Sequence, residues 1–250
     1  MDEIRFECRW SRDLTPSFVD DFCYVLNETW KGHISPQKIK SRYVDNYFGE
    51  SLLIVAYVDG VAAGTQAFWR NDINGRESYQ SGDSAVLAMY QGRGIFKTML
   101  KKGMAMLSQD ALLYGWPNMN SKPAFLSTGW DVLRKGKRLF FSSFGIIKHD
   151  NLSLIDYDYA KWYLKSRKNH IFSIKHKKNC YLVILTRHRW LVQLLGICDD
   201  KTASLFENLN NHPLMLYYKP SELIEDSKMG QIVVMHHKGE RIPVWKCDAI

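Results

Sequence analysis

The sequence lacks the features that mark membrane-spanning, secreted and zinc-binding proteins. None of its apolar runs reaches the ~18 to 20 residues that a membrane-spanning helix needs. Its first residues, Met1 to Arg5, have neither the basic end nor the apolar core of a signal peptide. The five cysteines are odd in number and show no Cys-x-x-Cys spacing, which argues against a disulfide framework and against a zinc site. We therefore expect a cytoplasmic protein with no integral membrane segment and no metal.

Acidic residues are scarce in the middle of the chain, which gives the protein a basic block. The formal net charge is +8 over 250 residues, and between Asp131 and Trp190 there are fourteen Lys and Arg against four Asp. Such a block suits nucleic acid, an acidic membrane surface or a phosphorylated small molecule, or it is simply a solvated face. Because no zinc finger or RNP-like aromatic strand accompanies it, we expect no nucleic-acid partner. With 46% apolar residues, the chain can form one large domain or two small ones.

The chain is organised around residues 84–107. An apolar run over 85–90 predicts a buried strand, and the turn Gln91-Gly-Arg-Gly94 follows it. The glycines let the backbone approach a ligand closely, and the first N–H groups of the helix that follows have no partner within it. The segment therefore predicts a phosphate site, although a turn of this kind also occurs as a plain connection. Apolar residues fall on one face of that helix, namely Ile95, Phe96, Met99, Leu100, Met104 and Leu107.

Periodicity and turn residues predict alternating strands and helices over residues 4–142. The order is β-α-α-β-β-β-α-β-α-β, and Asp59-Gly60 between two strands is a strong hairpin signal. Asp13 or Thr15 can cap the first helix, and Ser35 opens the second. Further on, three strands, a helix at 201–210 and another strand repeat part of this order without a Gly-x-Gly turn. We expect one domain over 1–145 and a second over 146–250.

The central segment and a later one resemble the GCN5-related N-acetyltransferase superfamily. The stretch Val86-Leu-Ala-Met-Tyr-Gln-Gly-Arg-Gly94 is similar to the acyl-CoA motif of that superfamily, although Ala88 and Met89 replace its Pro-Glu and Phe96 stands at a Gly or Ala position. The stretch Tyr114-Gly-Trp-Pro-Asn-Met-Asn-Ser-Lys-Pro-Ala-Phe-Leu-Ser-Thr-Gly-Trp130 is similar to a Gly-Phe-Pro-Asn…Gly-Trp pattern of one branch. The resemblance covers residues 4–142, and the remainder resembles the degenerate second half of some two-unit members.

The resemblance implies a mixed α+β fold, with a central, mostly antiparallel, splayed sheet flanked by helices and a C-terminal extension of the same type. It implies an acyltransferase that uses acetyl-CoA. Amides at the helix start would hold the diphosphate, and the Ala88 amide would polarise the thioester carbonyl. Asn118 would lie near the cofactor, or it is a turn residue after Pro117. The implied cofactor-binding residues are Leu87, Ala88, Gln91, Gly92, Arg93, Gly94, Ile95, Phe96 and Asn118.

Acetyl transfer to an amine also needs a base, because only the neutral amine attacks. Asp83, on the strand before the motif, is the first candidate, and it is equally a polar residue at a strand edge. His33, between the first two helices, is a second candidate, and a lone loop histidine is more often just exposed. The tyrosine that many relatives use to protonate the leaving thiolate is replaced by Phe125. Tyr114, Tyr79 or solvent would take its place, or the thiolate leaves unaided.

The expected acceptor follows from the branch that the second motif resembles. Proteins of that branch often acylate amino sugars, including nucleotide-linked sugars of surface polysaccharides, and the basic block over 131–190 would suit their diphosphate. Trp69, Trp116 and Trp130 would stack on a sugar or base, or they belong to the core. An aminoglycoside or another small amine is the alternative acceptor. A catalytically silent module that binds CoA or a nucleotide is the alternative function, and a homodimer remains open.

Overall fold

The computed structural model describes residues 2–72, 75–141, 154–166, 171–185, 191–209, 214–220 and 231–237. The chain divides into two compact units. The first comprises Met1–Leu133 and Val234–Glu240, and the second comprises Arg134–Val233 and Arg241–Ile250. The domain boundary expected between residues 145 and 146 lies outside the described residues. Of the described helices, none is long and apolar enough to span a membrane.

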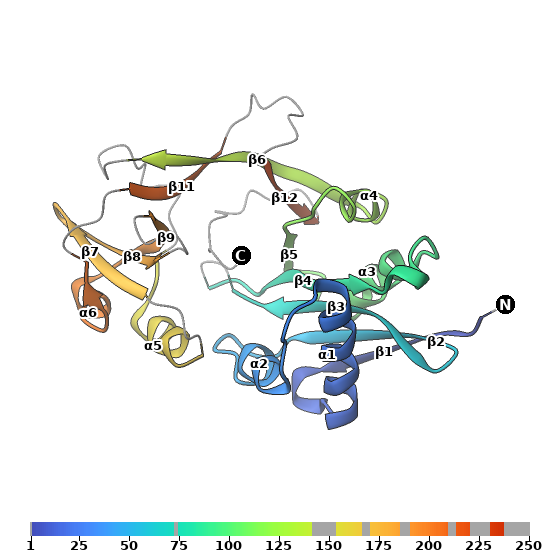
Figure 1. Ribbon diagram of the computed structural model, residues 1–250. Coiled ribbons are helices and arrows are strands. Elements are labelled where there is room, and N and C mark those ends of the chain that lie inside the picture. Colours follow the sequence, from blue (N-terminus) through green and yellow to red (C-terminus); the bar gives the residue numbers. More distant parts are fainter. Residues whose placement is uncertain are drawn as a thin grey trace. The chain divides into compact units, whose positions relative to one another are not determined.

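The first unit follows the predicted order of strands and helices (Figure 1). The side chains of Thr15 and Ser35 cap its first two helices, each by accepting a hydrogen bond from the backbone N–H three residues later. Its first elements are β1 (Ile4–Trp10), η1 (Ser11–Asp13), α1 (Pro16–Trp30), α2 (Pro36–Ile39), the π-helical turn η2 (Lys40–Val44), β2 (Leu52–Val58) and β3 (Val61–Arg70). They are followed by β4 (Ser78–Val86), the 3-10 turn η3 (Ala88–Tyr90), α3 (Ile95–Met106), β5 (Leu112–Gly115), α4 (Lys122–Leu126) and the start of β6 (Trp130–Phe141).

The strands of this unit are hydrogen-bonded in the order β1-β2-β3-β4-β5-β12, where β12 spans Gln231–His237. Strands β1 to β4 are antiparallel neighbours, and β5 is parallel to β4 and antiparallel to β12. Asp59 and Gly60 close the β2–β3 hairpin with φ values of 48° and 83°, as a primed turn requires. The sheet is mostly antiparallel and helices flank it, so the predicted mixed α+β class is confirmed.

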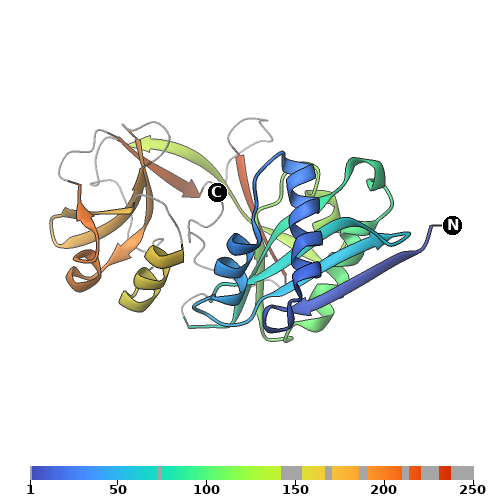
Figure 2. The same cartoon turned by 60° about the horizontal axis from the view of Figure 1, so that its bottom comes forward.

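Helix α3 and the turn η2 lie on opposite faces of this sheet. Phe68 of β3 points to α3, because a Cβ added to Gly103 would lie 2.1 Å from its ring. Trp69, the next residue, points to the other face, where the Arg42 guanidinium of η2 lies 5.7 Å from its ring centroid. We call these the α3 face and the η2 face. In Figure 2, α1, in blue, crosses in front of the strands of this unit.

The strand predicted over residues 85–90 ends earlier than expected, at Val86. The Leu87 N–H donates to the Ala63 carbonyl oxygen over 2.9 Å, and the chain then turns through η3. Met89 is 71% exposed, so its side chain does not continue the buried run. The apolar pattern alone therefore gives the wrong structure for the residues just before the glycine turn.

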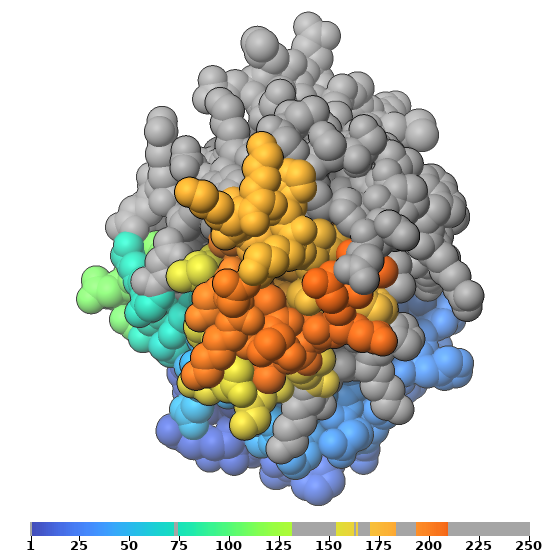
Figure 3. Space-filling view, turned by 90° about the vertical axis from the view of Figure 1, so that its left-hand side faces the viewer, coloured from blue at the N-terminus to red at the C-terminus, as the bar shows by residue number. Residues whose placement is uncertain are grey.

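Among its described residues, the second unit contains most of β6, the strands β7 to β11 and the first residues of β12. The order of β6 to β11 is β6-β11-β9-β8-β7-β10, with β7, β8 and β9 antiparallel and β11 parallel to β9. In the second unit, the antiparallel strands β7, β8 and β9 are followed by α6, by the short β10 and by β11, which is parallel to β9. In the first unit, β2, β3 and β4 are likewise followed by a helix, α3, and by β5, which is parallel to β4. The resemblance of the C-terminal half to the GCN5-related N-acetyltransferases stays a prediction. Figure 3 shows one face of the unit, with α5 in yellow and later elements in orange. The elements are α5 (Tyr157–Ser166), β7 (Ile171–His176), β8 (Asn179–Leu185), β9 (Leu191–Cys198), α6 (Asp200–Ala203), β10 (Glu207–Asn208) and β11 (Leu214–Pro220).

The helix predicted over residues 201–210 is much shorter in the structure. Asp199 caps α6 by accepting a hydrogen bond from the Thr202 N–H over 2.7 Å, and the helix ends at Ala203. The chain then enters β10, which pairs with β7. A strand pairing over a long sequence distance thus replaces the second half of the predicted helix.

Candidate active site

Two glycines shape the turn between β4 and α3. Gly92 and Gly94 have φ values of 78° and 75°, which residues with a Cβ rarely adopt. Gly94 is the N-cap of α3, and the first helical hydrogen bond runs from the Thr98 N–H to its carbonyl oxygen over 3.0 Å. Among the described side chains, none caps this helix end. The N–H groups that begin the helix at Ile95 therefore have no partner within it, and with the helix dipole they favour an anion at this turn.

Gln91 and Arg93 brace the turn from within the protein. Gln91 Nε2 donates to the Val86 carbonyl oxygen over 3.0 Å. Arg93 forms an ion pair with Asp2, and its guanidinium carbon lies 5.4 Å from the centroid of the Tyr90 ring. Because these side chains contact the protein itself, the turn offers a ligand chiefly its backbone. Of the predicted cofactor residues, Ala88, Gln91, Gly92, Arg93, Gly94 and Asn118 are exposed, Phe96 is half-buried, and Leu87 and Ile95 are buried.

Strands β4 and β5 separate beside this turn. Their parallel pairing ends at Ser81 and Gly115, while β4 continues to Val86. The last residues of β4 therefore extend past the end of β5. A Cβ added to Gly82, the first of these residues, would meet no described heavy atom within 4 Å. The backbone of this segment can thus bind an extended ligand by strand-like hydrogen bonds.

Phe96 and Phe125 fill the space between α3 and α4. Their ring centroids lie 5.7 Å apart, and the Phe125 ring is edge-on to Trp130 at 4.8 Å. A Cβ added to Gly115 of β5 would lie 3.3 Å from Phe125. Phe125 is buried and has no hydroxyl, so it cannot donate a proton where the resemblance expects a tyrosine. Phe96 packs α3 on α4, which explains a large side chain at a position where the resemblance expects Gly or Ala.

A partly buried ion pair holds Asp83 on the η2 face. Arg42 Nη1 donates to the two carboxylate oxygens of Asp83 over 2.9 and 2.8 Å, and the Tyr43 hydroxyl donates to Oδ2. The Asp83 side chain is only 10% exposed. Its φ of 45° lies beside a register shift between β3 and β4, and Thr65 Oγ1 donates to its carbonyl oxygen over 3.1 Å. This irregularity in the strand aims the carboxylate at η2.

The pKa values of Arg42 and Tyr43, the two partners of Asp83, depend on burial and on the negative charge of Asp83. Burial raises the pKa of Tyr43 well above its ordinary value, and the negative charge of Asp83 raises it further, so Tyr43 is neutral. Burial alone would lower the pKa of Arg42, but attraction to Asp83 raises it above its ordinary value, so Arg42 is cationic. Sequence reasoning missed both partners, because they precede Asp83 by about forty residues. The role of Asp83 as a base stays a prediction.

The other predicted site residues lie on separate elements. Tyr114 is buried in β5, and its hydroxyl accepts a hydrogen bond from Asn71 Nδ2 over 2.7 Å. Asn118 Oδ1 accepts hydrogen bonds from two of the backbone N–H groups that follow it, at 3.0 and 2.9 Å, and so forms an Asx turn before α4. His33 is exposed in the loop between α1 and α2. The catalytic and cofactor roles of these residues stay predictions.

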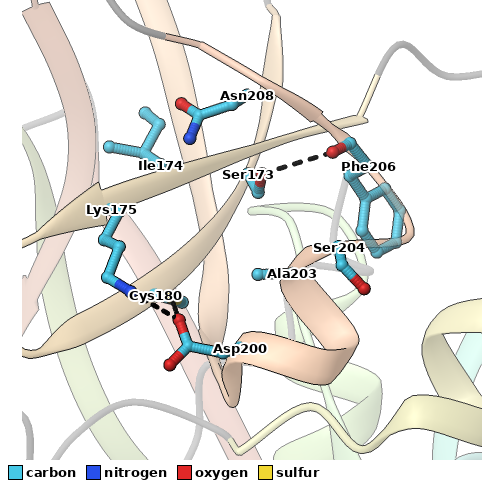
Figure 4. A pocket seen from close by; sticks show the side chains of 9 residues that line it. All are labelled: Ser173, Ile174, Lys175, Cys180, Asp200, Ala203, Ser204, Phe206 and Asn208. Carbon is cyan, nitrogen blue, oxygen red and sulfur yellow. Dashed lines mark hydrogen bonds and ion pairs between the residues drawn. The ribbon is translucent and has the colours of Figure 1, made fainter.

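The second unit contains a separate pocket of about 210 Å³ (Figure 4). Lys175 Nζ and Cys180 Sγ both contact Asp200 Oδ1, at 2.8 and 3.2 Å. Burial and the hydrogen bond to Asp200 raise the pKa of Cys180, so it remains a thiol and is a weak nucleophile. Within the described ranges, no three His, Cys, Asp or Glu side chains are grouped to hold a metal ion. The pocket is lined by Ser173, Ile174, Lys175, Cys180, Asp200, Ala203, Ser204, Phe206 and Asn208.

Solved structures share the fold of this chain at low sequence identity. A GCN5-related N-acetyltransferase from Kribbella flavida matches 94% of the chain over 71% of its own length, with a TM-score of 0.59 and 11% identity. One from Anabaena variabilis matches 93% over 72% of its length, with a TM-score of 0.59 and 10% identity. Eis1 from Mycobacterium abscessus matches 94% of the chain over 73% of its own length, with a TM-score of 0.55 and 9% identity. No protein-family model matches the sequence, and no curated protein matches it. The chain has the fold of the GCN5-related N-acetyltransferases.

Proposed function

We propose that this chain is an acyltransferase that moves the acetyl group of acetyl-CoA to an amine. The observation that carries the proposal is the turn with Gly92 and Gly94 at the uncapped start of α3, beside the part of β4 that extends past β5. Backbone amides at a helix start suit a diphosphate, and a strand edge suits an amide-rich arm, so the two features match the two halves of CoA. The fold shared with N-acetyltransferases supports the same activity.

The residues around the turn have room for this cofactor. A Cβ added to Gly82, Gly92 or Gly94 would meet no described heavy atom within 4 Å, so a ligand can approach the backbone there. In the proposal, amides from Gln91 onward hold the diphosphate, and the end of β4 binds the pantetheine arm. When bound, acetyl-CoA supplies the thioester that carries the acetyl group. The residues assigned to it are Leu87, Ala88, Gln91, Gly92, Arg93, Gly94, Ile95, Phe96 and Asn118.

The proposal assigns proton transfer to polar groups of the sheet and its loops. The acceptor arrives as an ammonium, and its nitrogen attacks only after it loses a proton. Asp83 takes this proton, while Arg42 and Tyr43 hold its carboxylate in place. As the C–N bond forms and the C–S bond breaks, Tyr114, whose hydroxyl already accepts a hydrogen bond, donates a proton to the leaving sulfur and regains one from the second proton that the nitrogen loses. His33 is the alternative base, supported by its place in the loop between α1 and α2.

A nucleotide-linked amino sugar of surface polysaccharide synthesis is the finer proposal for the acceptor. Its support is the likeness of residues 114–130 to a branch that acylates such sugars, together with the basic block over 131–190. An aminoglycoside or another small amine is the second candidate. A silent module that binds CoA or a nucleotide is the third, and the replacement of the expected tyrosine by Phe125 favours it.

Calorimetry with CoA and an assay of thiol release test the proposal together. The protein is titrated with CoA and then incubated with acetyl-CoA and a panel of nucleotide amino sugars, aminoglycosides and polyamines. We expect CoA to bind and at least one amine to gain the mass of an acetyl group as free thiol appears. Binding of CoA without acetyl transfer to any amine supports the silent module instead. Absence of CoA binding rejects both.

A further inference from the structure

Two buried glutamines in the central sheet differ in their hydrogen bonds. Gln66 of β3 is fully satisfied: its Nε2 donates to the Ala67 carbonyl oxygen and to Ser81 Oγ, each over 2.8 Å. Its Oε1 accepts a hydrogen bond from Ser84 Oγ. Gln80 of β4 is 6% exposed, and among the described residues none donates to its Oε1. A buried acceptor without a donor is costly and rare in protein interiors, so the free Oε1 of Gln80 needs an explanation.

Gln80 lies at the inner end of the opening between β4 and β5. It is opposite Trp69 in the register of β3 and β4, and level with Tyr114 in the register of β4 and β5. The next residue, Ser81, is the last of β4 that pairs with β5. Opposed residues of an antiparallel pair share a face, so Gln80 points with Trp69 to the η2 face. Asp83 lies on the same face, three residues further along β4.

The groups near Gln80 are two aromatic side chains and an ion pair that carries no net charge. The cation of Arg42 is offset by Asp83, and the aromatic side chains of Trp69 and Tyr114 lie on the two neighbouring strands. An amide oxygen accepts hydrogen bonds only from N–H or O–H donors. A ligand that satisfies Gln80 Oε1 must therefore supply an N–H or O–H donor.

We propose that Gln80 Oε1 binds and orients the acceptor amine by accepting a hydrogen bond from its nitrogen; this rests on the function proposed above. After a primary ammonium loses one proton, its nitrogen has two N–H groups and one lone pair. A hydrogen bond from one N–H to Gln80 leaves the lone pair free to attack the acetyl carbon. Gln80 thus requires an acceptor nitrogen that still carries an N–H after it loses its first proton, as primary and secondary amines do, and Asp83 lies within the same strand to take that proton.

The variant Gln80→Met keeps the length of the side chain and removes the acceptor oxygen. We expect the KM for the amine to rise about tenfold or more, because the bound amine loses its hydrogen bond. The KM for acetyl-CoA should stay within about twofold. The midpoint of thermal unfolding should stay equal or rise, since no buried oxygen is left without a donor. If the Gln80 oxygen had a merely structural role, the unfolding midpoint of Gln80→Met would fall instead.

The variant Gln66→Met is the matched control in the same sheet. It removes three hydrogen bonds, so its unfolding midpoint should fall while the KM for the amine stays within about twofold. If Gln66→Met does not fold, the unfolding and kinetic data for Gln80→Met still decide whether Gln80 binds the acceptor amine.

A lower unfolding midpoint with an unchanged amine KM in Gln80→Met overturns the proposal, because the oxygen is then bonded within the protein or to buried water. A wild-type chain that acetylates no amine defeats the proposed function, and the role of Gln80 with it. A wild-type chain that acetylates amines, and does so equally well after Q80M, defeats the role of Gln80 alone.

Discussion

The ring of Phe68 on β3 occupies the space beside Gly103 on α3, where an added Cβ would lie 2.1 Å from the ring. Phe68 is fully buried, so neither its ring nor the sheet can move aside easily. We expect Gly103→Ala to push α3 off the sheet and to lower the free energy of unfolding by about 1–3 kcal/mol, despite the higher helix propensity of alanine. Unfolding in urea measures the effect.

Gly32→Ala is the control for this substitution. An added Cβ at Gly32 would meet no described atom within 4 Å, and its φ is not in the left-handed region. We expect a change within about 0.5 kcal/mol, as for most surface substitutions. Equal stability of Gly103→Ala and the wild type would show that α3 packs more loosely on β3 than the structure indicates.

Gly94→Ala should weaken CoA binding beyond any loss of stability. Gly94 and Gly60 have φ values of 75° and 83°, and in both places an added Cβ meets no described atom within 4 Å. Each substitution should therefore cost about 1–2 kcal/mol of stability from the left-handed conformation. Only Gly94 lies at the start of α3, so only Gly94→Ala should raise the Kd for CoA in calorimetry. A similar rise after Gly60→Ala would argue against the turn as the diphosphate site.

Arg42→Met should destabilise the protein by about 2 kcal/mol, because it leaves the Asp83 carboxylate buried without its cation. Adding Asp83→Asn to this variant should recover part of the loss, and a double-mutant cycle measures the coupling. Arg12→Met is the control, since its partner Glu50 is exposed and such pairs contribute about 0–1 kcal/mol. Strictly additive effects of the substitutions at Arg42 and Asp83 would mean that the pair contributes nothing.

The buried thiol of Cys23 should make stability fall at high pH. Burial, followed by the charges of Asp20 and Asp83, raises its pKa from 9.0 to about 11. Above pH 9 the unfolded chain releases this proton while the folded chain keeps it. The stabilisation is therefore present below about pH 9 and is lost by about pH 11, a change of about 2 kcal/mol. Between pH 8 and pH 11, urea unfolding should show a smaller drop in the free energy of unfolding for Cys23→Ala than for the wild type. Equal drops would show that the Cys23 thiol is not the cause.

Local signals in the sequence were sufficient for the elements that frame the site. Thr15 before a helical pattern and Asp59-Gly60 between two apolar runs specify a helix start and a hairpin within a few residues, and the structure has both. Gly92 and Gly94 of the central turn, where the sequence predicts close approach to a ligand, have φ values of 78° and 75°, in the region that glycine adopts most easily. These features depend on neighbours in the chain, which the sequence displays directly.

The polar groups of the site depend on partners that are distant in the chain. Arg42 reaches Asp83 because η2 packs on β4, and no periodicity links residues 41 positions apart. The contact between Phe96 and Phe125 likewise requires α3 and α4 to meet. The difference between Gln66 and Gln80 is invisible in the sequence, because both are glutamines within strands of the same sheet and only the packed sheet shows which one has a donor.

Strand β5 lies between β4 and β12, a strand that the chain reaches only after most of the second unit. Gly115 of β5 is opposite Met235 of β12, while its other neighbour, β4, precedes it closely in the sequence (Figure 1). During synthesis on the ribosome, one edge of β5 therefore stays unpaired until residue 237 has emerged. Unpaired strand edges readily join other chains, so the nascent protein carries an aggregation-prone edge at β5 until β12 has been synthesised.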